Sequence, residues 1–156
     1  MIKYLVMDVD GTLTDGKIYM GSQGEMMKAF DIKDGYGIHD IAMPFGIVPV
    51  IITGRRSEIV ERRCQELGIK EVHQGVKDKL GKLREVTGDL SGVAYIGDDL
   101  NDLPCMDAVK VAGGVVGSPA DAVREVRDMT DFVAPHKGGN GAVRDFIDWL
   151  VNKEMN

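Results

Sequence analysis

Acidic side chains cluster at two places in this sequence. Asp8 and Asp10 end one apolar run, and a second acidic cluster, within residues 98–102, follows another. Two carboxylates as close as Asp8 and Asp10 repel each other unless a cation or a shared proton relieves them. Oxygen ligands without His or Cys favour Mg²⁺ over zinc. The two clusters therefore indicate a magnesium site.

Two further polar residues lie between the acidic clusters. Thr53, with Gly54 behind it, ends a third apolar run, and Lys79 stands at the start of a predicted helix. A hydroxyl and free backbone N–H groups at such a strand end can hold a phosphate. Each feature alone is weak evidence. The order DxDGT, TG, K and GDDxxD, with each motif after a strand or at a helix start, is hard to reach by chance.

The elements expected to position these residues alternate along the chain. Short apolar runs bounded by Gly-rich turns predict buried parallel strands, over residues 2–9, 47–52 and 93–96. Helical patterns lie between or after them, over residues 57–67, 78–86 and 121–129 and in a last helix starting near Gly141. This alternation predicts an α/β fold with a doubly wound parallel sheet. Ligands bind outside the carboxyl ends of the strands in such sheets, where the polar residues stand.

One segment, residues 17–30, departs from the alternation and is predicted to form a β-hairpin after the first strand. The chain is otherwise expected to form one domain over residues 1–156, with no cap domain. The side chains of Ile18, Met20 and Met26 are too apolar for a free ribbon, and an isolated hairpin is only marginally stable in water. We therefore expect hairpins of several subunits to pack together. The alternative is a hairpin folded onto its own domain.

Composition excludes several functional classes. The 156 residues are 44% apolar and 28% charged, and the net charge of −6 disfavours a nucleic-acid partner. No apolar run approaches the ~20 residues that span a bilayer, and the N-terminus is too short a run for a signal peptide. We therefore expect no membrane partner and a cytoplasmic location. Cys64 and Cys105 are expected to be buried thiols.

The motifs together resemble those of the haloacid dehalogenase superfamily. The segment 8–14, DVDGTLT, resembles its first motif, and Thr53, Lys79 and the segment 97–102 match the other three. The stretches LVMDVDGTLTDGKIYMGSQGE, KAFDIKDGYGI, QGVKDKL and GGNGAVRDF further resemble the 3-deoxy-D-manno-octulosonate 8-phosphate phosphatases. These are small members without a cap domain that act in lipopolysaccharide sugar synthesis. The resemblance covers nearly the whole chain.

The resemblance implies a Mg²⁺-dependent phosphomonoester hydrolase that works through an aspartyl phosphate. It implies that Asp8 is the nucleophile, that Asp10 is the acid and base, and that Thr53 and Lys79 bind the phosphoryl oxygens. The implied metal ligands are Asp8, the backbone carbonyl of Asp10, and Asp98. Asp99 and Asp102 are expected to orient the waters of the metal and Lys79.

The implied substrate is 3-deoxy-D-manno-octulosonate 8-phosphate. The residues expected to contact it are Asp10, Asp31, Ile32, Lys33, Asp34, Gly35, His39, Gly54, Arg55, Arg63 and Lys79. A guanidinium at Arg55 suits the carboxylate of a sugar acid, because it can donate two parallel hydrogen bonds. Relatives that act on a nine-carbon acid tend to carry Glu there. His39 stands where some members carry Arg, and Arg63 has the alternative of a solvated helix face.

Two alternatives stay open at this point. The substrate could be the nine-carbon keto-sugar acid 9-phosphate, or the chain could be an idle regulatory domain like that of some sialic acid cytidylyltransferases. A receiver domain also uses an acidic cluster, Thr and Lys, but DxDGT contradicts it. The resemblance also implies a homotetramer whose sites are completed by a neighbour. The stretch 138–141, GGNG, is expected to swing a tail carrying Arg144 over a catalytic cleft, its own or a neighbour's.

Overall fold

A parallel sheet runs through the centre of the molecule, and the computed structural model describes all residues from 1 to 156. Each pair of neighbouring strands is parallel, and the spatial order is β5-β4-β1-β6-β7-β8. The strands are β1 (Tyr4–Met7), β4 (Val48–Ile52), β5 (Glu71–His73), β6 (Val93–Ile96), β7 (Val115–Ser118) and β8 (Phe132–Val133). The predicted α/β fold with a doubly wound parallel sheet is confirmed.

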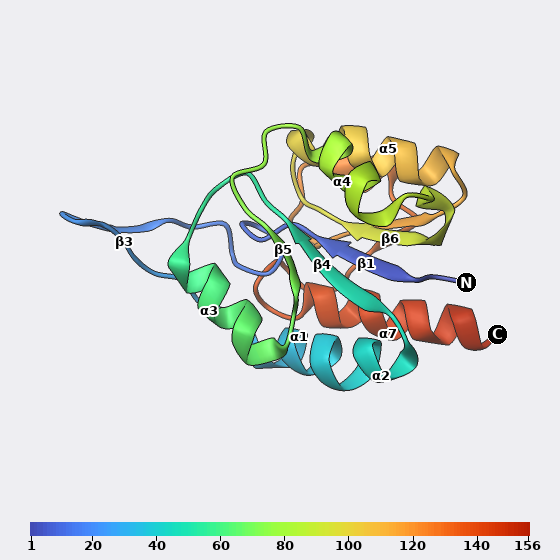
Figure 1. The fold of residues 1–156 in the computed structure, drawn as a ribbon, viewed down its shortest axis with the longest axis horizontal. Coiled ribbons are helices and arrows are strands. Elements are labelled where there is room, and N and C mark those ends of the chain that lie inside the picture. The colour runs from blue at the N-terminus through green and yellow to red at the C-terminus, as the bar shows by residue number, and fades with distance from the viewer.

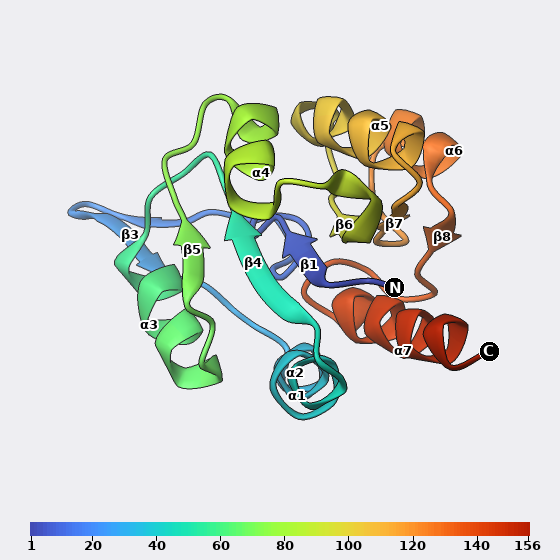
Figure 2. The same cartoon turned by 45° about the vertical axis from the view of Figure 1, so that its right-hand side comes forward.

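Helices cover both faces of this sheet (Figures 1 and 2). One layer holds α1 (Ile32–Tyr36), a π-helical segment (Gly37–Ala42), α2 (Met43–Phe45), α3 (Glu58–Leu67) and α7 (Ala142–Met155). The other layer holds α4 (Lys79–Thr87), α5 (Leu103–Val111) and α6 (Arg124–Met129). None of these helices has the length and apolar character needed to span a lipid bilayer.

The core follows the alternation of side chains along the strands. Leu5 and Met7 of β1 pack with the layer that contains α7, whereas Val6 packs with the layer that contains α5. A strand buried on both faces reads as a continuous apolar run, which is why β1 could be recognised in the sequence. Cys64 and Cys105 are buried free thiols, as expected.

The C-terminal half differs from the prediction in its details. The predicted helix over residues 121–129 begins only at Arg124, because Asp121 lies in a turn where its Oδ1 accepts from the Gly138 N–H at 3.0 Å. Helix α5 and strands β7 and β8 were not predicted. Strand β8 has two residues and β7 has four, one of them Gly117, so neither gives a strong apolar run.

The predicted hairpin is present as β2 (Tyr19–Gly21) and β3 (Gly24–Met27), which pair antiparallel. It extends away from the body of the protein in Figures 1 and 2. Four of its apolar side chains are exposed, namely Ile18 at 48%, Met20 at 63%, Met26 at 70% and Met27 at 53%. No cap domain stands over the sheet.

The chain order creates a crevice at the middle of the sheet. After β1 the chain adds β4 and β5 on one side, then returns to add β6, β7 and β8 on the other. The connections on the two sides of β1 therefore diverge, which is the topological switch point where open α/β sheets bind ligands.

Candidate active site

Three neighbouring strands deliver polar side chains to this crevice. Asp8 follows β1, Thr53 follows β4, and Asp98 lies two residues after β6. Because these strands are parallel and adjacent, the three side chains line one pocket of about 180 Å³. The other lining residues are Asp10, Gly54, Arg55, Asp99 and Asn101. The catalytic and metal residues predicted after the three strands thus meet in space.

The turn after β1 explains the DGT sequence. Gly11 has a φ of +89°, and a Cβ there would collide with the carboxylate of Asp98. The hydroxyl of Thr12 donates to Asp98 Oδ1 at 3.2 Å, which ties the turn to β6. Thr14 Oγ1 accepts from the Gly11 N–H at 3.2 Å and so holds the turn itself. These residues bring the backbone close to Asp98 and fix its carboxylate.

Lys79 reaches the same crevice from the first turn of α4. Its side chain is 5% exposed, and its Nζ lies 3.2 Å from Asp8 Oδ1 and 3.0 Å from Asp102 Oδ1. Burial lowers the pKa of Lys79, but Asp8 and Asp102 raise it by more, so the net pKa is raised. Lys79 therefore stays a cation beside Asp8.

Asp102 is fully buried and both of its oxygens are engaged. Oδ1 accepts from Lys79 and from the hydroxyl of Tyr95, the latter at 2.7 Å. Oδ2 accepts from the backbone N–H groups of Asp98 and Asp99 at 3.0 and 3.3 Å. Asp102 therefore holds Lys79 in place and anchors the loop that carries Asp98. Asp99 caps the following 3₁₀ turn through its own Oδ1.

The electrostatics of the two remaining carboxylates favour a bound cation. Burial, then the charge of Asp102, raises the pKa of Asp8 to about 6. Burial, then the charge of Asp8, raises the pKa of Asp98 to about 8. One carboxylate oxygen from each of Asp8, Asp98 and Asp102 lies within 4.8 Å of the others. Because Asp102 is already fully bonded, Asp8 and Asp98 are the side chains that fit a hard divalent cation.

Comparison with known proteins decides the family. The chain is 44% identical over 154 residues to the 3-deoxy-D-manno-octulosonate 8-phosphate phosphatase KdsC of Escherichia coli (strain B / BL21-DE3), covering 96% of this chain and 79% of the relative. The chain belongs to this family of phosphatases. No family model matches it. The family and the enzyme class indicated by the sequence motifs are confirmed.

Solved structures agree with this membership. The family's structure from Moraxella catarrhalis, in complex with magnesium ion, phosphate ion and a KDO molecule, has a TM-score of 0.89 and 41% identity, covering 97% of this chain and 86% of that one. A HAD superfamily (subfamily III A) hydrolase from Legionella pneumophila has a TM-score of 0.88 and 34% identity, covering 99% of this chain and 84% of that one.

The residues that the family resemblance assigned to the substrate do not all line one pocket. Arg55 and Gly54 line the pocket of Asp8. A second groove, of about 240 Å³ between α1 and α3, is lined by Ile32, Gly35, His39 and Arg63 among others, and shares no lining residue with the first. Of the rest, Asp31 caps α1 through a hydrogen bond from the Lys33 N–H, and Lys33 is exposed. One subunit therefore does not bring all the predicted substrate residues together.

Arg63 is held at this groove rather than free in solvent. Its guanidinium lies over the ring of Phe30, at 5.7 Å from the centroid, and its Nε is buried without a partner. A Cβ at position 35 would meet Arg63 Nη2 at 2.5 Å, so Gly35 leaves the space that the arginine needs. The reading of Arg63 as a solvated helix face is therefore wrong.

Asp34 joins two helices. It is 1% exposed, and its Oδ1 accepts from the Arg144 N–H at 3.0 Å, in the first turn of α7. Burial raises the pKa of Asp34 to about 6. The guanidinium of Arg144 lies over Tyr36, and its Nε donates to Asp148. Arg144 thus packs on α1 and is not among the residues that line the pocket of Asp8.

The GGNG stretch is bound to the turn after β1 rather than free to swing. The Gly139 N–H donates to the carbonyl of Thr12 at 3.1 Å, and the Gly138 N–H donates to Asp121. His136, just before it, pairs with Asp145 at 2.8 Å. In this structure α7 starts directly after the stretch and packs on the body, and Arg144 does not lie over the pocket of Asp8 in the same subunit.

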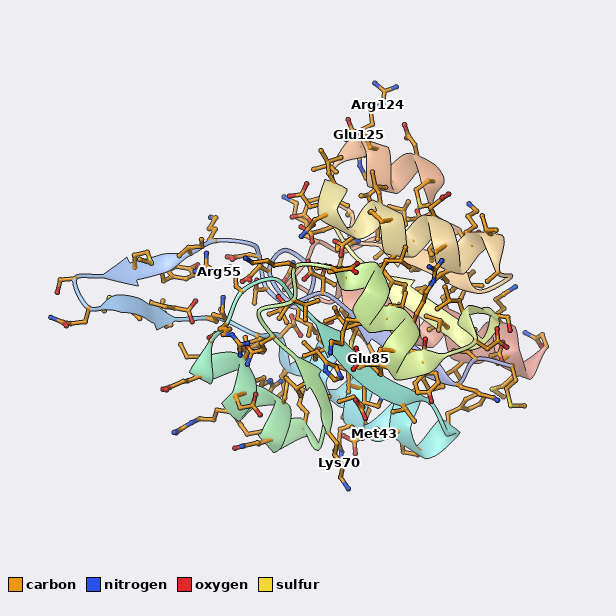
Figure 3. The ribbon with its side chains drawn as sticks, turned by 45° about the horizontal axis from the view of Figure 1, so that its top comes forward. Met43, Arg55, Lys70, Glu85, Arg124 and Glu125 are labelled. Carbon is orange, nitrogen blue, oxygen red and sulfur yellow. The ribbon has the colours of Figure 1, made fainter.

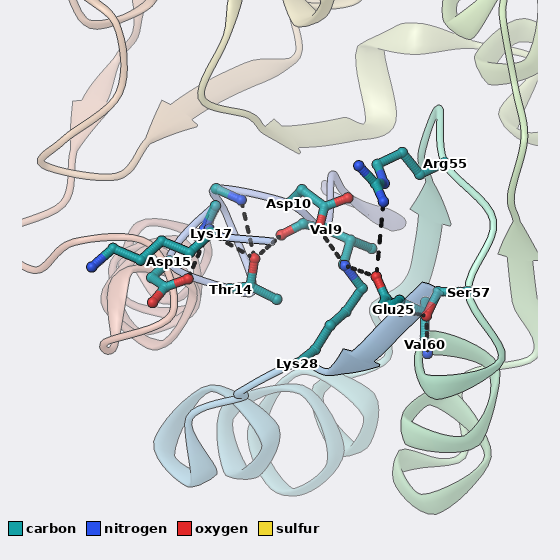
Figure 4. A network of polar contacts seen from close by, with 12 residues as sticks. Val9, Asp10, Thr14, Asp15, Lys17, Glu25, Lys28, Arg55, Ser57 and Val60 are labelled. Carbon is teal, nitrogen blue, oxygen red and sulfur yellow. Dashed lines mark hydrogen bonds and ion pairs between the residues drawn. The ribbon is translucent and has the colours of Figure 1, made fainter. Parts of the chain in front are cut away.

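Two residues at the site were missed by the sequence analysis. Lys28 and Glu25, both from the hairpin, reach back to the crevice: Lys28 Nζ lies 2.6 Å from Asp10 Oδ1 and 3.1 Å from Glu25 Oε2 (Figure 4). No catalytic motif marks them as site residues. The only available signal was the pair of opposite charges at i, i+3 in a segment that is largely apolar.

Proposed function

We propose that this phosphatase hydrolyses 3-deoxy-D-manno-octulosonate 8-phosphate through an aspartyl phosphate on Asp8, with Mg²⁺ as its cofactor. The observation that carries the proposal is the buried set at the switch point, in which Lys79 bridges Asp8 and Asp102 while Asp98 lies beside them. The relatives from Escherichia coli and Moraxella catarrhalis that carry this activity in their names support it.

The chemistry follows from two carboxylates that differ in their surroundings. Asp8 is 5% exposed and fixed, so it suits in-line attack on phosphorus. This attack forms the acyl phosphate bond of Asp8 while the bond from phosphorus to the sugar oxygen breaks. Asp10, whose side chain is 22% exposed at the pocket, gives its proton to the departing sugar oxygen. It then takes a proton from the water that hydrolyses the acyl phosphate, which restores both groups.

Lys79 and Thr53 suit the phosphoryl oxygens. Lys79 is a buried cation beside Asp8, and the hydroxyl of Thr53 lines the pocket without any side-chain hydrogen bond to the protein. Both can therefore stabilise charge that develops on the transferred group.

The metal would be held by Asp8, Asp98 and the backbone carbonyl of Asp10. When bound, Mg²⁺ neutralises the charge that otherwise keeps an anionic nucleophile away from an anionic phosphate. The raised pKa values of Asp8 and Asp98 support this assignment, because these two buried carboxylates hold their protons to higher pH when no metal ion neutralises their charge. Asp99, at the rim of the pocket, is proposed to orient waters of the metal.

Substrate recognition is proposed to involve both grooves. Arg55 lies beside the hairpin in Figure 3. Its side chain is 47% exposed and lines the pocket of Asp8, so it can meet a carboxylate of the substrate. An arginine here favours the eight-carbon acid over the nine-carbon acid. The Arg63 groove, formed with Gly35 and His39, is proposed to contact the sugar.

We also propose that the protein is a homotetramer in the cytoplasm, with sites at subunit interfaces. The support is the exposed apolar hairpin next to the pocket, together with the separation of the two predicted substrate grooves. A neighbouring subunit can supply the contacts that one subunit leaves out. The idle regulatory domain is disfavoured, because Asp8, Asp10, Thr53, Lys79 and Asp98 are all present and assembled.

Replacing the nucleophile tests the proposal. We expect Asp8→Asn to abolish release of phosphate from the octulosonate phosphate with Mg²⁺ present, and Asp10→Asn to reduce it by at least about 10²-fold. Phosphate release by the purified variants, with circular dichroism to check folding, measures both. If the wild type hydrolysed the nine-carbon phosphate faster, the substrate would be wrong; turnover by Asp8→Asn above a few per cent would exclude the aspartyl phosphate.

A further inference from the structure

The hairpin contributes a lysine, Lys28, whose side chain is buried. Lys28 follows β3 near the surface of the molecule, yet its neighbours cover all but 3% of its side chain. An ammonium group withdrawn from water is costly unless charged partners compensate it. Lys28 has two, the carboxylates of Asp10 and Glu25, at 2.6 and 3.1 Å. Figure 4 shows its side chain extended between them.

The contact with Lys28 holds one oxygen of the Asp10 carboxylate, Oδ1, and leaves the other, Oδ2, free. Lys28 is the only side chain that donates a hydrogen bond to Asp10, and it does so at Oδ1. The residue also lines the pocket of Asp8, so Oδ2 is the atom available to a leaving group or a water. A general acid and base needs its reactive oxygen in a defined direction, because small errors in orientation cost rate steeply.

Lys28 is itself held from the opposite side. Glu25 accepts from the hydroxyl of Ser57 at 2.6 Å, and Ser57 is the N-cap of α3. Glu25 also lies 4.0 Å from Arg55. The path from α3 through Glu25 and Lys28 to Asp10 therefore passes through the hairpin, so the hairpin determines where the Asp10 carboxylate points.

We propose that Lys28 is a positioning residue that orients Asp10 for proton transfer to the leaving oxygen, and that the hairpin contributes to catalysis through this contact. The proposal rests on the phosphatase function proposed above and adds to it a residue that acts through Asp10 without touching the reacting atoms.

Leaving-group dependence separates positioning from a merely structural role. Departure of a sugar alkoxide needs a proton from Asp10, whereas p-nitrophenolate is weakly basic and leaves without one. The ratio kcat/KM covers only the steps up to departure of the leaving group, so later hydrolysis of the acyl phosphate does not enter. We expect Lys28→Met to lower kcat/KM for the octulosonate phosphate about 10- to 100-fold, and for p-nitrophenyl phosphate less than about threefold.

Matched variants complete the experiment. Lys17→Met removes an exposed lysine at the start of the same hairpin and should leave kcat/KM unchanged for both substrates. Lys28→Arg, which keeps the charge, should recover part of the loss. Introduced into Asp10→Asn, the Lys28→Met change should cost little more, because the residue on which it acts is gone. If Lys28→Met does not fold, Lys28→Gln carries the same comparison.

The outcomes are distinct. Equal losses on the two substrates, no loss on either, or full additivity with Asp10→Asn would overturn the positioning role of Lys28. Failure of the wild type to hydrolyse either ester with Mg²⁺ would instead overturn the proposed function itself.

Discussion

Arg55 lines the pocket of Asp8, where we propose that it contacts the substrate and takes no part in phosphoryl transfer. It stands two residues beyond Thr53 and its side chain is half-exposed at the mouth of the pocket. We expect Arg55→Ala to lower kcat/KM for the octulosonate phosphate by about 10- to 100-fold, because a charge-assisted hydrogen bond is worth about 1.5–3 kcal/mol. The same change should hardly affect p-nitrophenyl phosphate. Steady-state kinetics on both esters measures this, and equal losses would show that Arg55 serves the chemistry or the fold.

The raised pKa values of Asp8 and Asp98, together with that of Asp34, predict how the stability of the metal-free protein depends on pH. In the folded protein Asp8 and Asp98 have pKa values of about 6 and about 8, well above the value of about 3.9 in an unfolded chain. Between these values the folded state holds protons that the unfolded state has released, so raising the pH favours unfolding. The stability that these protons provide is complete below about pH 4 and is lost as the pH rises through 6 and 8.

We therefore expect the Tm of the chelator-treated protein to fall from pH 4 towards pH 8. Added Mg²⁺ should raise the Tm more at pH 8 than at pH 5, because the cation competes with protons for the same oxygens. Asp98→Asn should flatten the pH dependence and remove the response to Mg²⁺. A Tm of the metal-free wild type that rises over this interval would contradict the assignment.

At the scale of elements, Asp34 is the link between α1 and the last helix. Its buried carboxylate accepts from the first turn of α7, where it also compensates the positive end of the helix. We expect Asp34→Ala to reduce the free energy of unfolding by about 1–3 kcal/mol, since it leaves a buried N–H without a partner. Urea unfolding measures the loss. Asp40→Ala, which removes an exposed aspartate of the same helical segment, should have an effect near zero.

The elements differ in how far the sequence could predict them. Strands β1, β4 and β6 are buried runs that end in polar motifs, so both the strands and their residues Asp8, Thr53 and Asp98 could be predicted. Strand β8 pairs with β7 through only two residues. Its position in the sheet depends on this pairing, which no local sequence pattern predicts. Lys28 could not be predicted either, because its partner Asp10 lies 18 residues away and the contact exists only once the hairpin folds back.

At the scale of the whole molecule, the exposed hairpin predicts assembly. Apolar side chains on both of its strands are uncovered in the single chain. We expect the wild type to be a homotetramer, the closed assembly that the family resemblance implies. The double variant Ile18→Glu, Met26→Glu should dissociate it and lower activity on the sugar phosphate together. Light scattering with enzyme assays measures both, and a fully active monomeric wild type would exclude an assembly role for the hairpin.

The central position of β1 also has a consequence for biosynthesis. In chain order β1 precedes β4 and β6, the two strands between which it lies in the sheet. Until residues 93–96 have emerged, one edge of this apolar strand has no partner, and such open edges invite pairing with other chains. The hydrogen bond from Thr12 to Asp98 spans 86 residues. Asp8 is thus synthesised well before Asp98, and its surroundings can close only after residue 98 has left the ribosome.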